Sequence, residues 1–312
     1  MTKKQNKLVS VAAVVLTLPL KMSRLPERGT TVLGSAKRPG VGEAAEVMLA
    51  AARQGVPVLN MSCLGTGPNS TQARQALRDA NINTNTVEVV GDIGMKIQMI
   101  EAGGYYASVL TTGVEVDISG RELDKVSMHP GDVVYISAGD LAHTSYRAAL
   151  SQWLPSLPEQ VKVVMAATPQ ISQIEPRYVR EVLPYVDVLT CNEYESQFLP
   201  GSVGHVTCGW VAERLPESAW VVERIGAYGA KLIDTQRETM VPSLSVKVAD
   251  TLGVGSAHTG VLLAELVKGR DPLAALQRAN VAGALAAEKH GNDTSPGQSE
   301  IDERIGEVPA YR

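Results

Sequence analysis

Residues 250–260 read Asp250-Thr251-Leu252-Gly253-Val254-Gly255-Ser256-Ala257-His258-Thr259-Gly260 and decide the fold, because two close glycines lead into the apolar run 261–267. A glycine turn before a helix presents free backbone N–H groups and the positive end of the helix dipole, which together bind anions such as phosphate. Ser256 stands beside that phosphate, where a proton-accepting side chain is expected, and a hydroxyl is a weak base near neutral pH. The stretch predicts a phosphate site that lacks its proton acceptor. Ordinary helix-entry glycines are the alternative interpretation.

Strands and helices alternate along most of the chain, which predicts an α/β fold with a mostly parallel sheet covered by helices on both faces. The predicted strands are 9–16, 56–61, 133–137, 162–167, 188–191, 220–223 and 230–233. The predicted helices are 43–54, 70–79 capped by Ser70 or Thr71, 144–153, one from Pro176, and two after Gly253, the last running from Asp271 to about His290. Ligands of such sheets lie beyond the carboxyl ends of the strands. Chemistry is therefore expected in segments 17–42, 65–69, 166–170, 192–195, 224–229 and 253–256.

Residues 86–116 interrupt this alternation. The β-prone pieces 86–90, 96–100 and 106–111 are separated by Gly91, Gly94 and the pair Gly103-Gly104. Short strands between glycine turns are typical of hairpins without helices.

The N-terminus has two interpretations. Lys3, Lys4 and Lys7 precede the apolar run 8–20, which imitates a secretory signal, but no small-x-small cleavage site follows. The run is rich in valine and contains Thr17 and Pro19, so a buried first strand is favoured over a signal peptide. The run is also too short to span a bilayer, and no membrane partner is expected.

Composition narrows the classes of function. The 312 residues carry a net charge of −4 with scattered basic residues, so no nucleic-acid partner is expected. Cys63, Cys191 and Cys208 lie far apart, which argues against disulfides and zinc and favours the cytoplasm.

Two further segments carry candidate chemistry. Asn192 and Glu195 follow a predicted strand, and an amide and a carboxylate so spaced could steer a hydrated Mg²⁺. A helix cap with acidic first-turn residues explains the same residues, and Asn192 could do both. Residues 224–229 predict a hairpin turn with glycines at positive φ. His258 is two residues beyond Ser256, on the opposite side of a helix, and is expected to be a packed histidine.

Together these segments resemble the ribokinase-like, phosphofructokinase-B (PfkB) family of carbohydrate kinases, over nearly the whole chain. The resemblance is carried by the stretch 250–256, where members usually read D-T-x-G-A-G-D, and by Asp271-Pro272-Leu273 and Arg278-Ala279-Asn280 further on. The helix 42–55 is similar to the N-terminal signature of the family, Asn192-x-x-Glu195 to its N-x-x-E motif, and 224–229 to its nucleotide-side turn.

The resemblance implies one ribokinase-like domain over 1–312, with a small β lid at about 17–37 and 86–116 and a homodimer through that lid. It implies ATP-dependent phosphoryl transfer, with Mg²⁺, to a hydroxyl of a small sugar-like or nucleoside-like acceptor. Gly253, Val254 and Gly255 would hold the phosphate and Asn192 with Glu195 would organise magnesium. Gly226, Gly229 and Asn280 would line the nucleotide site, and Asp250 would help to bind a monovalent cation.

The departures from the family pattern gather on the acceptor side. The base position is Ser256 and the sugar-binding acid aligns with Thr17 or, one residue off, Leu16. A glycine pair becomes Val41-Gly42, the next glycine becomes Ala44, and the sugar-binding asparagine becomes Glu46, a replacement base or a new acceptor contact. Loss of a general base removes about 10²- to 10⁴-fold of rate. An active kinase with an altered pocket and a non-catalytic protein that binds nucleotide or a small ligand both remain open, and a nicotinamide-dependent enzyme is disfavoured.

Overall fold

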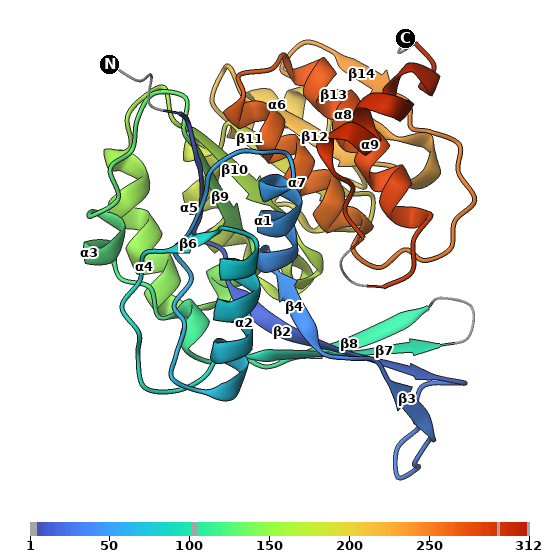
Figure 1. Cartoon of the computed structure of the whole chain (residues 1–312). Coiled ribbons are helices and arrows are strands. Elements are labelled where there is room, and N and C mark those ends of the chain that lie inside the picture. The colour runs from blue at the N-terminus through green and yellow to red at the C-terminus, as the bar shows by residue number, and fades with distance from the viewer. Residues whose placement is uncertain (1–4, 102–104, 292–293, 311–312) are drawn as a thin grey trace.

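The computed structural model describes residues 5–101, 105–291 and 294–310 and has a nine-stranded sheet at its centre (Figure 1). The strand order is β14-β13-β12-β11-β10-β9-β1-β5-β6, parallel from β6 to β12 and antiparallel at β13 and β14. Its strands are β1 (Leu8–Ser10), β5 (Val58–Asn60), β6 (Asn83–Thr84), β9 (Val133–Ser137), β10 (Lys162–Ala166), β11 (Val188–Asn192), β12 (Trp220–Arg224), β13 (Ala230–Ile233) and β14 (Glu238–Val241). The α/β fold with a mostly parallel sheet is confirmed.

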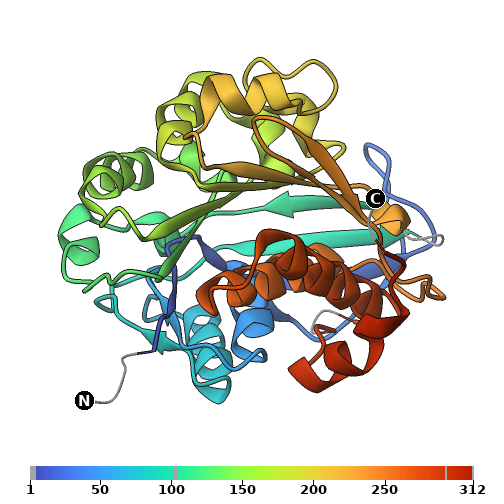
Figure 2. The same ribbon diagram turned by 90° about the horizontal axis from the view of Figure 1, so that it is seen from above.

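Helices cover both faces of this sheet, as the view from above shows (Figure 2). One face carries α1 (Ala44–Ala52), α2 (Pro68–Asp79), α7 (Val254–Val267) and α8 (Pro272–Ala287), with α9 (Gln298–Arg304) packed on α8. The other carries α3 (Gly120–Leu123), α4 (Thr144–Trp153), α5 (Pro176–Val182) and α6 (Cys208–Arg214). The continuous apolar strands are buried because both faces are covered.

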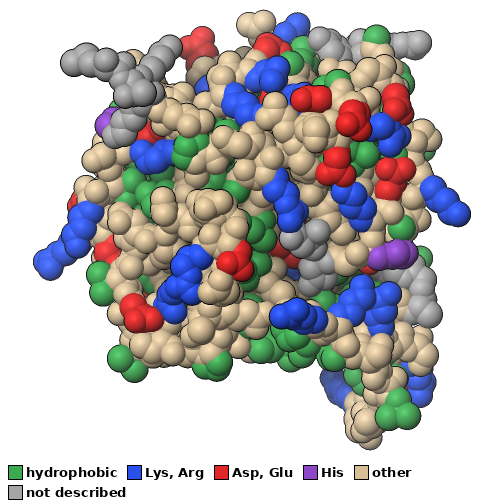
Figure 3. Space-filling model, viewed as in Figure 1, with side chains coloured by type: hydrophobic (Ala, Val, Ile, Leu, Met, Phe, Trp, Pro, Cys, Tyr) green, Lys and Arg blue, Asp and Glu red, His purple; other side chains and the backbone are tan. Residues whose placement is uncertain are grey.

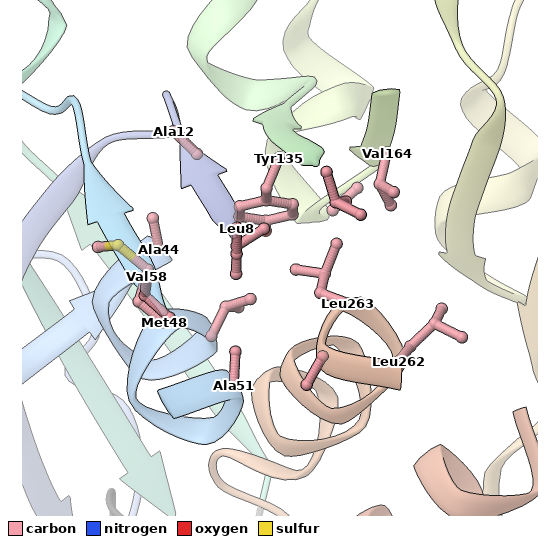
Figure 4. Packing of buried hydrophobic residues seen from close by; sticks show 14 of the residues in the cluster. Leu8, Ala12, Ala44, Met48, Ala51, Val58, Tyr135, Val164, Leu262 and Leu263 are labelled. Atoms are coloured by element: carbon pink, nitrogen blue, oxygen red, sulfur yellow. The ribbon is translucent and has the colours of Figure 1, made fainter. Parts of the chain in front are cut away.

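The core beneath α1 and α7 explains how two distant segments meet (Figure 4). Met48 and Ala51 of α1 and Leu262 and Leu263 of α7 are buried with side chains of the strands. Gly260 permits the close approach of the two helices: a Cβ atom there would lie 2.4 Å from the Val47 carbonyl oxygen and 2.5 Å from the Ala50 Cβ atom. The absent side chain therefore sets the separation of α1 and α7.

A second sheet projects from the first (Figure 1). It contains β2 (Val14–Met22), β3 (Gly34–Ala36), β4 (Gly40–Glu43), β7 (Met95–Glu101) and β8 (Tyr106–Leu110), in the order β3-β2-β7-β8 with β4 also paired to β2. Its residues overlap the segments predicted to form a lid. Figure 3 shows Lys and Arg side chains on the surface of this projection. Closure over a ligand stays a prediction.

Several predicted elements need correction. The predicted first strand 9–16 is two strands, β1 and β2, which belong to different sheets and are joined by residues 11–13. Residues 86–90 form no strand and contribute one isolated bridge, between Val89 and Gly65. Lys3, Lys4 and Gly103-Gly104 lie outside the described residues.

The caps of two helices also differ. Helix α2 follows Gly67, and neither Ser70 nor Thr71 is its N-cap: the Asp92 carboxylate accepts the N–H groups of Asn69 and Ser70 at 3.0 and 2.7 Å. Helix α8 ends at Ala287, before His290. In the described part of the chain, no helix combines the length and the apolar character that a bilayer crossing requires.

Candidate active site

One large cavity, of about 1140 Å³, opens along the carboxyl ends of the parallel strands and beneath the second sheet. It has two ends that meet at the N-terminus of α7. One end is lined by the segments 192–195, 224–229, 243–255 and 280–287 in part, and the other by residues of β2, α1, β7, β8 and the loops after β8 and β9. We name these the nucleotide end and the acceptor end, after the ligands that the family resemblance implies for them.

The glycine turn opens α7 as the sequence predicts. Gly253 is the N-cap in the left-handed region, with φ of 78°, and no side chain caps the helix. The first-turn N–H groups have no acceptors within the helix. Gly253, Val254, Gly255 and Ser256 all line the cavity, so these donors lie where an anion would meet both ends.

Ser256 meets a carboxylate from a distant part of the chain. Its Oγ donates a hydrogen bond of 3.0 Å to Oε2 of Glu46, which is 210 residues earlier and belongs to α1. The close packing of α1 on α7 at Gly260 brings the two side chains together. A carboxylate therefore lies one hydrogen bond from the position where the sequence lacks one.

Asn192 and Glu195 form the cap of a short turn. The Asn192 Oδ1 accepts the N–H groups of Tyr194 and Glu195 at 2.9 and 2.8 Å, and the Glu195 Oε2 accepts the N–H group of Asn192 at 2.9 Å. The Arg224 guanidinium also donates to Glu195 Oε2 at 3.1 Å and to the Thr259 hydroxyl. Both side chains line the cavity, so the capping interpretation is confirmed and a role in organising magnesium stays a prediction.

The predicted nucleotide-side glycines form the expected turn. Gly226 and Gly229 have φ of 59° and 107° and line the cavity. A Cβ atom at Gly229 would lie 2.2 Å from the Val241 carbonyl oxygen, so β12 can turn into β13 only with glycine there.

Asn280 lines the nucleotide end but is engaged within the protein. Its Nδ2 donates to the Val241 carbonyl at 2.8 Å and its Oδ1 lies 3.0 Å from Nε2 of His258. Burial, with the charge of Arg224, lowers the pKa of His258 to about 3, so this packed histidine is neutral. Asp250 also lines the cavity, its Oδ1 accepts the N–H group of Leu252, and binding of a monovalent cation there stays a prediction.

Two predicted acceptor residues lie outside the cavity lining. The Thr17 hydroxyl packs against Gly42, where a Cβ atom would lie 1.9 Å from Thr17 Oγ1. Val15 of β2 and Ala13, which immediately precedes that strand, line the cavity instead. Thr17 and Gly42 therefore do not line the cavity, and their contact with an acceptor stays a prediction.

The acceptor end contains charged residues that the sequence did not single out. Lys96 of β7 donates to Glu43 at 2.7 Å. Burial disfavours the charged lysine, but Glu43 and Glu46 outweigh it and raise the pKa of Lys96. Glu43 has a positive φ of 52°, an unusual value for a residue with a side chain. The ion pair with Lys96 holds the Glu43 carboxylate at the cavity, although the Glu43 backbone has this unfavourable conformation.

Asp140 and Glu115 complete the acceptor end. Asp140 follows β9, and its Oδ2 accepts the N–H group of Ala13 at 2.8 Å. Glu115 is buried and accepts the N–H groups of Gly94 and Gly113. Asp140 follows a parallel strand, so the rule that ligands lie beyond such strands also points to the segment 138–143. Lys96 and Glu115 come from the second sheet and its connections and had no such signal.

Comparison with known proteins agrees with this architecture. The profile described as pfkB family carbohydrate kinase matches residues 5–298. The uncharacterized sugar kinase YegV of Escherichia coli (strain K12) is 23% identical over 96% of this chain and 94% of its own length. An ATP-dependent ribose-1-phosphate kinase of Halopiger xanaduensis is 25% identical over 93% and 95%. The crystal structure of a Cryptococcus neoformans ribokinase in complex with ADP shares the fold, with a TM-score of 0.79 and 17% identity over 97% of this chain and 100% of that chain.

Proposed function

The chain belongs to the pfkB family of carbohydrate kinases, and on that premise we propose that it transfers a phosphoryl group from ATP to a hydroxyl of a small sugar-like or nucleoside-like acceptor. The observation that carries the proposal is the 3.0 Å hydrogen bond between Ser256 and Glu46 at the N-terminus of α7. It supplies the carboxylate that the base position lacks. Among the relatives, one is an ATP-dependent sugar-phosphate kinase.

In the proposed reaction, Glu46 is the general base and Ser256 positions it. The Glu46 carboxylate takes the proton of the acceptor hydroxyl as the acceptor oxygen forms its bond to the γ-phosphorus, and the bond from that phosphorus to the oxygen of ADP breaks. The amides at the start of α7 donate to the phosphoryl oxygens and stabilise the charge that develops on them. Ser256 holds Oε2 of Glu46 at the N-terminus of α7 through its hydrogen bond of 3.0 Å.

The nucleotide end supports ATP as the donor. Backbone N–H groups of the α7 turn and the open turn at Gly226 and Gly229 suit a phosphate chain and its nucleoside. Magnesium neutralises phosphate charge in such transfers and keeps most of its waters. The described hydrogen bonds of Glu195 use Oε2, so Oε1 is the atom through which this carboxylate would hold a magnesium-bound water.

The proposal is tested by Glu46→Gln. With ATP and a panel of sugars and nucleosides, this variant should lose about 10²- to 10⁴-fold in kcat, because a general base supplies about that much. Ser256→Ala should lose less, since it removes only the positioning hydroxyl. The double variant Ser256→Asp/Glu46→Gln should regain turnover, because it returns a carboxylate to the same place.

The controls separate catalysis from binding. Glu159→Gln, at an exposed surface site, should retain full turnover. Glu46→Gln should retain the rise in melting temperature that ATP produces, because Glu46 lies at the acceptor end. A nucleotide-dependent rise in melting temperature without turnover on any acceptor would instead establish the second candidate, a non-catalytic nucleotide-binding protein.

We also propose a homodimer through the second sheet and a cytoplasmic location. Tyr106 and Val109 of β8 are about half exposed, at 55% and 52%, and a partner would cover them. All three cysteines are free and Cys63 and Cys191 are buried, which suits a reducing compartment. Light scattering of Val109→Glu beside the parent chain tests the dimer.

A further inference from the structure

The acceptor end carries an excess of negative charge. Besides Glu46, which serves as the base, its lining includes Glu43, Glu115 and Asp140. In the described lining of this end, Lys96 is the one lysine or arginine, and it is paired with Glu43 at 2.7 Å. Burial lowers the pKa of His143, so this histidine adds no cation at neutral pH. Glu115 and Asp140 are left without a cationic counterpart in that lining.

Backbone donors fix the Glu115 carboxyl group in place. Its Oε2 accepts the N–H groups of Gly94 at 2.8 Å and Gly113 at 3.0 Å. Burial raises the pKa of Asp140 to about 7 against the hydrogen bond from Ala13, with the charges of Glu43 and Glu115 adding to the effect. A positive group between these side chains would relieve that repulsion.

A separate observation points to a ligand rich in hydrogen-bond donors. Gln98 of β7 is 3% exposed and lines the cavity, two residues from Lys96 on the same face of the strand. Its buried Oε1 has no hydrogen-bond partner among the described residues. An unpaired buried acceptor is costly, and an O–H or N–H group of a ligand would satisfy it.

The charge of a ligand decides how it interacts with the side chains of the acceptor end. A phosphorylated acceptor would bring negative charge toward Glu115 and Asp140 and would be repelled. A neutral polyol would satisfy Gln98 and leave the carboxylates unneutralised. An ammonium group on a polyhydroxyl skeleton offers both donors and charge. Groups of three or more metal-ligating side chains are absent from the described residues, which does not favour a bare metal ion.

We propose that the acceptor end selects an amine-bearing polyhydroxyl compound, such as an amino sugar, and rejects phosphorylated sugars. The inference rests on the proposed function only in taking this end as the acceptor site. Asp140 and Glu115 hold the ammonium group, Gln98 accepts from a hydroxyl or N–H group, and Glu46 faces the hydroxyl that is phosphorylated.

Calorimetry and thermal shift test the proposal with matched skeletons. Glucosamine, N-acetylglucosamine, glucose and glucose 6-phosphate are compared at pH 7, where most of the amine is protonated and about half of Asp140 is ionised, and the galactose series is compared in the same way. In at least one series the amine should bind tenfold or more tighter than its neutral partners, and the sugar phosphate should give no shift. Equal binding of amine and neutral sugars, tighter binding of the phosphate, or no amine-dependent shift in either series overturns the proposal.

Variants assign the effect to its residues. Asp140→Asn should reduce the advantage of the amine at least fivefold and leave glucose binding within twofold, whereas Glu159→Gln should keep the full advantage. If Asp140→Asn keeps the full advantage, the assignment is overturned. Turnover with ATP is measured in parallel. An amine preference without turnover sustains this inference and removes the proposed function, and turnover without an amine preference does the reverse.

Discussion

The two ends of the cavity present different groups to a ligand. At the nucleotide end the donors are backbone N–H groups of the α7 turn, and the side chains nearby are occupied with one another, as in the pair of Arg224 and Glu195. At the acceptor end the recognition groups are side chains, among them Glu43, Lys96 and Asp140, on elements of the second sheet and the loops. Backbone recognition persists as long as the fold does, whereas side-chain recognition can change with single substitutions. This difference explains why the departures from the family pattern gather at one end.

The largest expected loss of stability comes from a substitution at the nucleotide end. Arg224→Ala leaves Glu195, 3% exposed, without its cation, and should lower the free energy of unfolding by roughly 3–5 kcal/mol. The matched change at the acceptor end, Lys96→Met, should cost about 1 kcal/mol, because Lys96 and Glu43 are each about one-fifth exposed. Urea unfolding of both variants makes the comparison. Equal losses would show that the two ends are equally built into the fold.

The next largest effect concerns the packing of α1 on α7, between the two ends of the cavity. Gly260→Ala forces a Cβ atom against Val47 and Ala50 and should cost about 1–3 kcal/mol of unfolding free energy. It should also lower turnover, since separation of α1 from α7 moves Glu46 from Ser256. Gly255→Ala is the control for stability, because nothing lies within 4 Å of a Cβ atom there. A fully stable Gly260→Ala variant would mean that α1 and α7 can separate without loss.

The last effect is a pH dependence at the acceptor end. The folded pKa of Asp140, about 7, is above its usual value of about 3.8, so between these pH values the folded chain binds the extra proton and stability falls as pH rises. Asp140→Asn removes this penalty and should raise the free energy of unfolding at pH 8, with no gain below about pH 4. Thermal melts across this pH range measure it.

Asp92 provides a control of opposite sign. Burial opposes ionisation there, but hydrogen bonds from Ser70 and Asn69 lower the pKa of this carboxyl. Its stabilising effect is therefore present at neutral pH and is lost as pH falls through the folded pKa. Asp92→Asn should lower stability at pH 8, where Asp140→Asn raises it. The same sign for both variants would contradict the assignment.

Much of the fold follows from the sequence by itself. Strand Val133–Ser137, helix Thr144–Trp153 and strand Ala230–Ile233 match their predicted bounds. The two strands are largely apolar runs bounded by polar or glycine residues, and Pro155 follows the helix closely. The division of the first strand had no such signal. Residues 11–13 are as apolar as their neighbours, and the chain changes sheets there because of distant partners: Asp140 accepts from Ala13 and the Ser62 hydroxyl from Val14.

The site divides in the same way. The glycine turn and the Asn192 cap depend on neighbours in the chain, so their geometry could be predicted. The meeting of Ser256 with Glu46 depends on the packing of two helices 210 residues apart, which local patterns do not encode. Asp140 follows a parallel strand, and such positions can be recognised in the sequence. Lys96 and Gln98 belong to β7, and their place at the cavity depends on the position of the second sheet.

The long sequence separation of Ser256 and Glu46 has a consequence for folding. Strand β1 lies between β5 and β9 in the large sheet, and α1 packs on a helix that begins at residue 254. Contacts of such separation close large loops and form slowly. During synthesis, the N-terminal half emerges long before its partner helix exists. We therefore expect the proposed base to reach its place only after nearly the whole chain has been made, so that no shorter product could carry out the reaction.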